Sequence, residues 1–410
     1  MSTSSLKTPI QAKDLYTKQE LDIAIERNKY IYKEYFDPNF IRAINTYVFD
    51  RITDSYFRPE FIGFDEPIER NNEKHPVILA SNHSGMAFPW DAMVFGCGMF
   101  KKFEYDVSKV FRVLTAPMLS QTKIMHPYTM LHAWKMAGGV DARFLNFETM
   151  MHLPVSGGNL LIYPEGVPGI GKGFDKRYQL QRLATSFVRM ALKYKTDIVS
   201  FSTVNAEYVA PFMYSSKLVN KWINKVGIPF LPLGPLTLVL LFPFAFYLSF
   251  PCKMFFVKGR RYSVYEWIDK PFEDITKDEI QATCDKLKNL MQEDLDEAVE
   301  KYGKAPFKMG EFFKKMIINW RDFPYNTPLG WPFTFSDFEK QWFAGGKEGK
   351  PIKIYTGFGA IFRFLWRVPL SICYFIPLLG WFPIIIVAIY KWNKSRNTRK
   401  NKNKGLEALN

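Results

Sequence analysis

The chain of 410 residues is long enough for one large domain with additional segments. Its residues are 47% hydrophobic, and its formal net charge of +15 favours an anionic partner, either nucleic acid or a membrane surface. The sequence contains no nucleic-acid recognition motif, and its 38 Phe and long apolar runs favour the membrane. Its four cysteines are too few for a disulfide framework and lack metal-ligand spacing, so we expect a reducing compartment and no bound metal.

The N-terminal region, residues 1–60, is expected to be helical after a polar start. Residues 1–20 lack the apolar core of a secretory leader, so we expect the protein to meet a membrane from the cytoplasmic face. Residues 21–36 and 40–57 carry apolar side chains at helical spacing. These helices are expected on the surface of the main domain or, alternatively, in contact with a membrane surface.

Residues 61–272 alternate short apolar runs with helical stretches. This pattern is typical of an α/β domain with a mixed central sheet flanked by helices. Helices are expected at 92–103 and 179–194. Five strands are expected, at Pro76–Ser81, Lys109–Leu114, Asn159–Tyr163, Asp197–Val204 and Lys253–Lys258.

Three segments of different character end or follow this domain. Residues 228–251 are uncharged, but their five prolines argue against one straight membrane span. We expect this segment to dock on the domain and dip into lipid, or else to be buried. Residues 273–304 are expected to form a helix whose apolar stripe packs on the domain, with Asp274 or Thr276 as its cap. Residues 305–366 are expected to form an interfacial segment rich in Gly, Pro and aromatic residues, and the stretch 319–351 within it is expected to be irregular.

Residues 367–392 contain a second uncharged run, 368–390, whose centre, PLLGWFP, has the composition of a turn. The sequence predicts a hairpin that enters and leaves the same leaflet or, alternatively, a single span. Residues 391–404 contain seven basic residues and no acidic one. The tail, residues 393–410, is therefore expected to rest on anionic lipid headgroups at the cytoplasmic side, or to be a disordered solubilising tail.

The stretch SNHSGMAFPWD, residues 81–91, places a histidine among small residues directly after the strand expected at 76–81. An imidazole can take a proton from a hydroxyl group, and it works best when a carboxylate holds its other ring nitrogen. Asp91, at the start of the helix expected at 92–103, is the nearest such carboxylate. Alternatively, His83 is an ordinary loop residue and Asp91 only caps the helix.

The stretch GGNLLIYPEGVPGIGKG, residues 157–173, places a glycine-rich loop after another strand. Backbone N–H groups of such a loop can bind phosphate or a developing oxyanion. Lys172 lies within the loop, and Lys176, Arg177 and Arg182 follow it. The loop is not a P-loop, because it lacks the Gly-Lys-Ser/Thr sequence.

Taken in order, NHSG…D, GGVDAR, LLIYPEG and DIVSFSTVNAEY resemble the four sequence blocks of the lysophospholipid (glycerolipid) acyltransferase family, over roughly residues 60–270. The resemblance implies that His83 is the general base and that Asp91 orients it. It also implies that Arg143 contacts the acceptor headgroup. Glu165 and Gly166 would shape the acceptor pocket. The fourth block, around residues 204–207, would line the acyl or acceptor side.

Two features differ from the pattern of that family. Seven residues separate His83 from Asp91 where the family usually has four, although a subgroup of the family resembles this chain. The Pro-Glu-Gly sequence is followed here by Val-Pro-Gly, so the arginine expected to bind phosphate is absent. Lys172, Lys176 or Arg177 could bind the phosphate instead, or the acceptor could lack it.

The sequence therefore predicts a membrane-associated O-acyltransferase. It would move a fatty acyl group from acyl-CoA or an acyl carrier protein to the hydroxyl of a lysophospholipid-like acceptor. No other cofactor is expected, and no protein nucleophile is needed. The alternatives are a transferase with a non-phosphate lipid acceptor, a catalytically silent lipid-binding protein and a lipid hydrolase. The acceptor, the acyl chain length, the donor thioester and the oligomeric state stay open.

Overall fold

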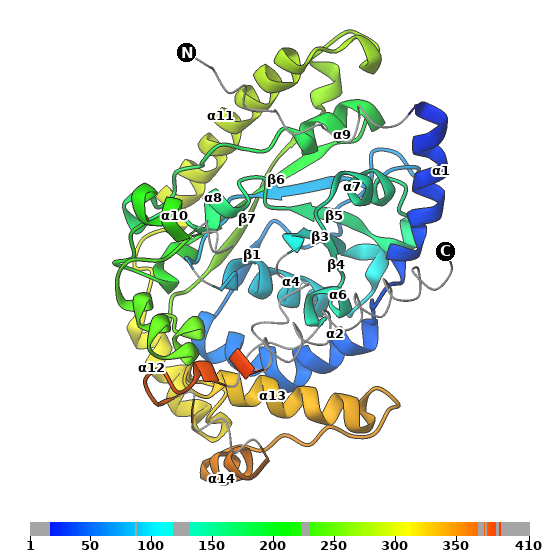
Figure 1. Ribbon diagram of the computed structural model, residues 1–410. Helices are drawn as coiled ribbons and strands as arrows, with labels where there is room; N and C mark the ends of the chain where they lie inside the picture. Colours follow the sequence, from blue (N-terminus) through cyan, green and yellow to red (C-terminus); the bar gives the residue numbers. More distant parts are fainter. Residues whose placement is uncertain are drawn as a thin grey trace, which may run out of the picture.

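The computed structural model describes residues 17–86, 88–117, 132–223, 230–367, 373, 375–382 and 385–386. Its centre is a seven-stranded sheet of order β1-β7-β6-β2-β5-β3-β4 (Figure 1). Only β6 and β7 pair antiparallel in this sheet, so the predicted α/β fold with a mixed sheet is confirmed. The strands are β1 Glu60–Ile62, β2 Ile78–Ser81, β3 Phe111–Thr115, β4 Gly139–Asp141, β5 Asn159–Ile162, β6 Ile198–Val204 and β7 Phe255–Tyr262.

Helices cover both faces of the sheet, because successive strand side chains point to opposite faces and both sets are apolar. Leu79 of β2 joins one hydrophobic core, whereas Ile78 and Ala80 join the other. The first core contains side chains of α2 (Pro38–Ile44), α4 (Trp90–Lys102) and α13 (Trp331–Gln341). The second contains side chains of α7 (Phe144–Met150), α9 (Ser186–Tyr194) and α11 (Lys277–Tyr302). Figure 1 shows these two groups of helices on opposite sides of the sheet.

The N-terminal region is helical, as predicted, but its second segment lies in the core. The helical run that starts with α2 and continues through α3 (Asp50–Ile52) buries Phe40, Phe49 and Ile52 completely. The expectation that residues 40–57 lie on the surface or on a membrane is therefore wrong. The preceding helix, α1 (Lys18–Asn28), is bound at its end, where Asn28 donates a hydrogen bond to the Thr149 hydroxyl of α7.

Helix α11 confirms the packing helix expected at 273–304. Thr276 is its N-cap, and Glu279 completes a capping box with it. The predicted stripe is largely buried, through Ile280, Leu287, Met291 and Leu295. Helix α9 begins later than predicted, at Ser186 instead of Gln179, since the intervening backbone is bound to the chain after β5. There, the Ala184 N–H donates to the Pro164 carbonyl.

No helix in the described ranges is both long and apolar enough to cross a bilayer. Residues 230–251 contain two short 3₁₀ helices, η10 (Pro235–Leu240) and η11 (Pro243–Tyr247), and not the one straight helix that the prolines argued against. The prediction of an irregular segment at 319–351 is wrong where α13 forms within it. Two further helices, α12 (Met309–Ile318) and α14 (Phe358–Arg367), lie on either side of that segment.

The turn expected within PLLGWFP is present at 377–380. Most of 367–392 and all of 393–410 lie outside the described residues, so the hairpin, the span and the basic tail stay predictions. The remaining α-helices of the described part are α6 Ala133–Met136, α8 Val167–Ile170 and α10 Lys217–Ile223.

Candidate active site

The carboxyl ends of β2, β5 and β6 meet at one edge of the sheet, which is where open α/β sheets place their sites. The chain leaving β2 stays attached to β6 through the side chain of Asn82. Its Nδ2 donates to the Thr203 carbonyl (2.9 Å), and its Oδ1 accepts the Thr203 N–H (2.7 Å). The next residue, His83, is therefore held at the sheet edge and not on a free loop.

His83 and Asp91 form a close pair. The distance from His83 Nδ1 to Asp91 Oδ2 is 2.7 Å, and the same oxygen accepts the Ser84 backbone N–H at 3.0 Å. The Asp91 carboxylate is fully buried in the first turn of α4, where the helix dipole favours a negative charge. The His83 side chain is 12% exposed. With Nδ1 engaged by the carboxylate, Nε2 carries the lone pair that can accept a proton.

Seven intervening residues do not separate this pair, because the loop turns back on itself. Gly85 has a φ of 127° and Met86 a φ of 63°, both in the left-handed region. A Cβ at Gly85 would also lie 2.8 Å from the Phe88 carbonyl oxygen. The enlarged loop therefore needs glycine at this position.

Glu165, in the turn that follows the neighbouring strand β5, stabilises the histidine loop. Its buried carboxylate accepts the backbone N–H of His83 at 2.8 Å and that of Gln181 at 2.6 Å. Gly169 of α8 packs directly against the Glu165 side chain, since a Cβ there would lie 2.5 Å from Glu165 Cβ and 3.1 Å from His83 Cβ. Gly166 has a φ of 57° and starts the turn into α8. The role of both Glu165 and Gly166 in an acceptor pocket stays a prediction.

Lys172 lies inside the protein, between two carboxylates. Its Nζ is 3.8 Å from Glu165 Oε2 and 3.7 Å from Glu207 Oε1, and its side chain is 2% exposed. Burial raises the pKa of Glu207, and the charge of Lys172 opposes that rise. The positive charge is thus already compensated internally. Binding of an acceptor phosphate by Lys172 stays a prediction that would require the ammonium to leave these partners.

One small pocket beside the histidine loop is lined by Lys172, Glu207 and Ser84. Within the part of the chain that the structure describes, Ser84 Oγ and Glu207 Oε2 are buried without a hydrogen-bond partner. Because buried polar atoms are normally paired, these two atoms mark a polar lining behind the His83 loop.

The glycine-rich loop offers fewer free N–H groups than its sequence suggests. The N–H groups of Gly169, Gly171 and Lys172 donate to carbonyl groups within the loop, and that of Gly166 donates to Tyr163. Most of the loop backbone is therefore satisfied locally, which reduces its capacity to bind an oxyanion.

The two remaining candidate residues lie apart from the histidine. Arg143 is exposed at the N-cap of α7 and follows β4, which is three strands, or about 14 Å, from β2. Arg177 is exposed, with its guanidinium 4.9 Å from the centre of the Phe174 ring. Across the described residues, no hydrogen bond or ion pair connects either arginine to His83. The structure thus groups His83, Asp91, Glu165 and Lys172 and leaves both arginines outside this group.

Sequence reasoning missed Tyr163 as a member of the site. Its ring packs on the imidazole of His83, with centroids 4.5 Å apart. Burial, with a further contribution from the charge of Asp91, raises the pKa of its hydroxyl. This hydroxyl has no hydrogen-bond partner in the described ranges. The available signal was its place at the end of a strand, directly before Pro-Glu-Gly. Asn82 was missed as well, although it directly precedes His83.

A larger cleft of about 450 Å³ lies between α4, β1 and residues 50–60. Two of its lysines are already paired with acidic residues of the same cleft. Lys101 is 3.0 Å from Asp50, and Lys253 is 2.6 Å from Glu60 and 2.9 Å from Glu311. We therefore assign the candidate site to the His83 loop. No cluster of three potential metal ligands occurs among the residues described.

Comparison with known proteins gives relatives but no activity. No family model matches the chain, and no solved structure matches it. Uncharacterized proteins of Mycobacterium bovis and Mycobacterium tuberculosis are 30% identical over 202 residues, which is 49% of this chain and 51% of theirs. A Mycobacterium leprae protein, also uncharacterized, is 29% identical over 203 residues, 49% of this chain and 50% of its own. The chain spans about half the length of the curated relatives it matches.

Proposed function

We propose that the protein is an O-acyltransferase at the cytoplasmic face of a membrane. It transfers a fatty acyl group from acyl-CoA or an acyl carrier protein to the hydroxyl of a lysophospholipid-like acceptor. The observation that carries the proposal is the 2.7 Å contact between His83 Nδ1 and the buried Asp91 carboxylate. This pair lies at the carboxyl end of a central parallel strand, and the four sequence blocks of the chain add support to this reading.

In the proposed reaction, His83 Nε2 takes the proton of the acceptor hydroxyl, and the hydroxyl oxygen attacks the thioester carbonyl. Asp91 stabilises the imidazolium that forms and keeps Nδ1 protonated. The tetrahedral intermediate then collapses, its C–S bond breaks, and the departing thiolate takes the proton from Nε2. The products are an ester and a free thiol, so protons and electrons balance without an oxidant or a metal.

Direct transfer suits this site better than hydrolysis through a serine nucleophile. The serine beside the histidine, Ser84, donates its backbone N–H to Asp91. Its buried hydroxyl has no hydrogen-bond partner among the described residues. A serine nucleophile would instead need its hydroxyl within hydrogen-bond reach of the imidazole.

One observation favours a second acceptor class. The ammonium of Lys172 is buried between Glu165 and Glu207, so the basic residue of the glycine-rich loop is already neutralised. An acceptor without a terminal phosphate, such as diacylglycerol or a long-chain alcohol, would not require that charge. Both acceptor classes belong in the first assay.

The test is acyl transfer from labelled acyl-CoA to a panel of lysophospholipid, diacylglycerol and alcohol acceptors. We expect His83→Ala to reduce transfer by about 10²- to 10⁴-fold, the usual contribution of general base catalysis. Lipid binding by the variant should be unchanged. If wild type and variant both bind lipid and neither transfers acyl groups, the protein is a lipid-binding protein instead. Release of free fatty acid without an acceptor would indicate a hydrolase.

A further inference from the structure

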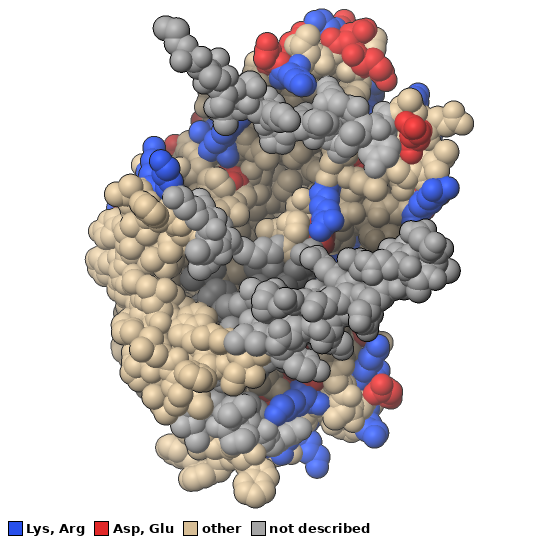
Figure 2. Space-filling model, viewed as in Figure 1, with Lys and Arg blue, Asp and Glu red and all other residues tan. Residues whose placement is uncertain are grey.

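Exposed apolar side chains gather on one side of the molecule, outside the candidate site. They come from five segments, 212–222, 238–250, 309–320, 358–366 and 375–386, which we call the apolar face. Figure 2 shows a broad uncharged surface at the left and at the base of the molecule, where Figure 1 places α10, α12 and α14. The most exposed of its side chains are Phe212, Leu218, Trp222, Ile317, Ile318, Trp320, Phe358, Phe362, Trp366 and Leu378.

Helix α14 displays an aromatic ridge to the outside. Phe358, Phe362 and Trp366 are spaced four residues apart and are 79%, 74% and 87% exposed. Residues at this spacing lie on one face of a helix. The other side of α14 is bound to the protein, since Ala360 is buried and Arg363 packs on the Tyr355 ring. The aromatic side chains of the ridge therefore point away from the protein. Exposure of such an apolar patch to water is unfavourable, which is typical of an interaction surface.

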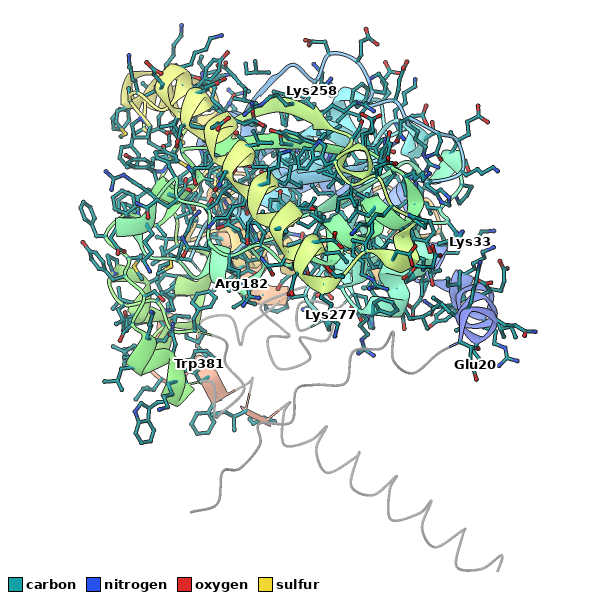
Figure 3. The ribbon with its side chains drawn as sticks, turned by 90° about the horizontal axis from the view of Figure 1, so that it is seen from above. Glu20, Lys33, Arg182, Lys258, Lys277 and Trp381 are labelled. Atoms are coloured by element: carbon teal, nitrogen blue, oxygen red, sulfur yellow. The ribbon has the colours of Figure 1, made fainter. Side chains whose placement is uncertain are left out.

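The 375–386 segment of the apolar face is also attached to the rest of the protein. The turn at 377–380 is bound to the segment around η10, because Leu378 N–H donates to the Leu241 carbonyl and Trp381 Nε1 donates to the Leu240 carbonyl. The Phe375 ring stacks on Phe244. Figure 3 shows Trp381 at the edge of the molecule, away from α11.

The charges within the apolar face are almost all positive. The described residues of its five segments include the cations Lys217, Lys221, Lys314 and Lys315. They also include Arg363, whose guanidinium already lies 3.7 Å from the Asp337 carboxylate. Their one acidic residue, Glu311, is already paired with Lys253. Two copies of this face would bring like charges together, whereas an anionic lipid surface would attract them. This pattern favours a bilayer over a second copy of the chain.

We infer that the apolar face docks on an anionic lipid bilayer, with α14 lying in the interface and its aromatic ridge inserted among the acyl chains. Interfacial helices of this kind combine aromatic residues on one face with flanking cations. The inference rests on the proposed function, because the same bilayer would supply the acceptor. It adds the orientation of the protein on that bilayer.

The docked orientation would bring the bilayer beside the candidate site. Phe230, which precedes η10, packs so closely on the glycine-rich loop that a Cβ at Gly171 would lie 2.9 Å from its ring. Phe212 of the apolar face lies 6.2 Å, centroid to centroid, from Phe174 of the same loop. The 171–174 loop thus lies against Phe212 of the apolar face through Phe174 and lines the pocket beside the His83 loop through Lys172.

The inference is tested by flotation with phosphatidylcholine vesicles, with and without phosphatidylserine, in the absence of an acyl donor. We expect Phe358→Ser, Phe362→Ser and Trp366→Ser together to weaken binding by about tenfold or more, because each aromatic side chain can bury about 150–250 Å². The matched control replaces Ile23 and Tyr30, exposed residues outside the apolar face, with serine and should bind as wild type does. Near-ultraviolet circular dichroism establishes that each variant is folded.

A second variant tests the charges without touching the ridge. Lys217, Lys221 and Lys314 are exposed, so their replacement with glutamate should leave the fold intact and abolish the preference for phosphatidylserine vesicles. Wild-type binding by the ridge variant would overturn the inference. The inference would also be overturned if the wild-type protein did not bind vesicles and instead formed dimers, and if the ridge variant did not form these dimers. Vesicle binding by the wild-type protein, measured beside its acyl transfer, separates the two proposals, since a wild-type protein that docks but does not transfer acyl groups would refute only the proposed function.

Discussion

The buried cluster of Glu165, Lys172 and Glu207 gives the most demanding test of how the site is built. Replacing Lys172 with Met keeps the aliphatic stem and removes the ammonium. The two carboxylates, each within 4.0 Å of Lys172 Nζ, then lose their shared cation in a region closed to water. Removing one partner of a buried ion pair costs about 3–5 kcal/mol, because the remaining charge stays buried and uncompensated. The free energy of unfolding of a domain is only about 5–15 kcal/mol.

The cost should depend on pH in a defined direction. Burial already raises the pKa of Glu207, and Lys172 counteracts this, so the substitution should raise that pKa further. A carboxyl group with a raised pKa in the folded state binds more protons when folded than when unfolded. Its contribution to stability is therefore fully present at acid pH and is lost as the pH rises from its ordinary value of about 4.3 through the raised value. Lys172→Met should thus be least destabilised in acid and most destabilised near neutrality.

Urea unfolding monitored by tryptophan fluorescence, from about pH 5 to about pH 8, measures both effects. Adding Glu207→Gln to Lys172→Met removes one of the two charges and should restore part of the stability and weaken the pH dependence. Lys176→Met, at an exposed position nearby, should change the free energy of unfolding by no more than about 0.5 kcal/mol. If Lys172→Met were as stable as wild type at neutral pH, or if adding Glu207→Gln restored no stability, Lys172 would not be the buried partner of these two carboxylates.

Three further predictions concern the histidine loop. Asp91→Asn should leave the fold intact and lower acyl transfer by about 10²- to 10⁴-fold, since the amide no longer stabilises a charged His83; the labelled acyl-CoA assay measures this. Gly169→Ala should lower the free energy of unfolding in urea by about 1–3 kcal/mol, because its Cβ would lie 2.5 Å from Glu165 Cβ. Gly310→Ala, with nothing within 4 Å, is the matched control and should not destabilise. Tyr163→Phe removes a buried hydroxyl without a described partner, so its melting temperature should match or exceed that of wild type; a clear decrease would show that the hydroxyl is bonded.

Much of the fold could be predicted because its signals are local. Each of the five predicted strands is a short apolar run, and all five overlap an observed strand. The capping box at Thr276 and the apolar stripe behind it specify α11 within its own sequence. The pairing of His83 with Asp91 could also be proposed, because both residues lie in one short loop.

The features that sequence reasoning missed depend on contacts between distant segments. Strands β1 and β4 have three residues each, too few for a pattern, and exist because β7 and β3 offer them partners. Residues 40–57 have an amphipathic pattern that is the same for a core helix and a surface helix. Which one occurs is decided by α13, whose aromatic side chains pack on Phe40 and Phe49. Likewise, the sequence shows that residue 172 is a lysine, but it does not show that Glu165 and Glu207 lie on either side of its ammonium group.

The position of the Asp91 carboxylate illustrates why spacing in the sequence is a weaker guide than anchoring in the fold. Trp90, the first residue of α4, is buried against Phe57, Phe88 and Trp331. This aromatic cluster fixes the start of α4, and with it the position of Asp91, independently of how many residues connect it to His83. The left-handed turn of the enlarged loop takes up the additional length. The pair can therefore form at this spacing because both of its ends are anchored, one by the sheet and one by the aromatic core.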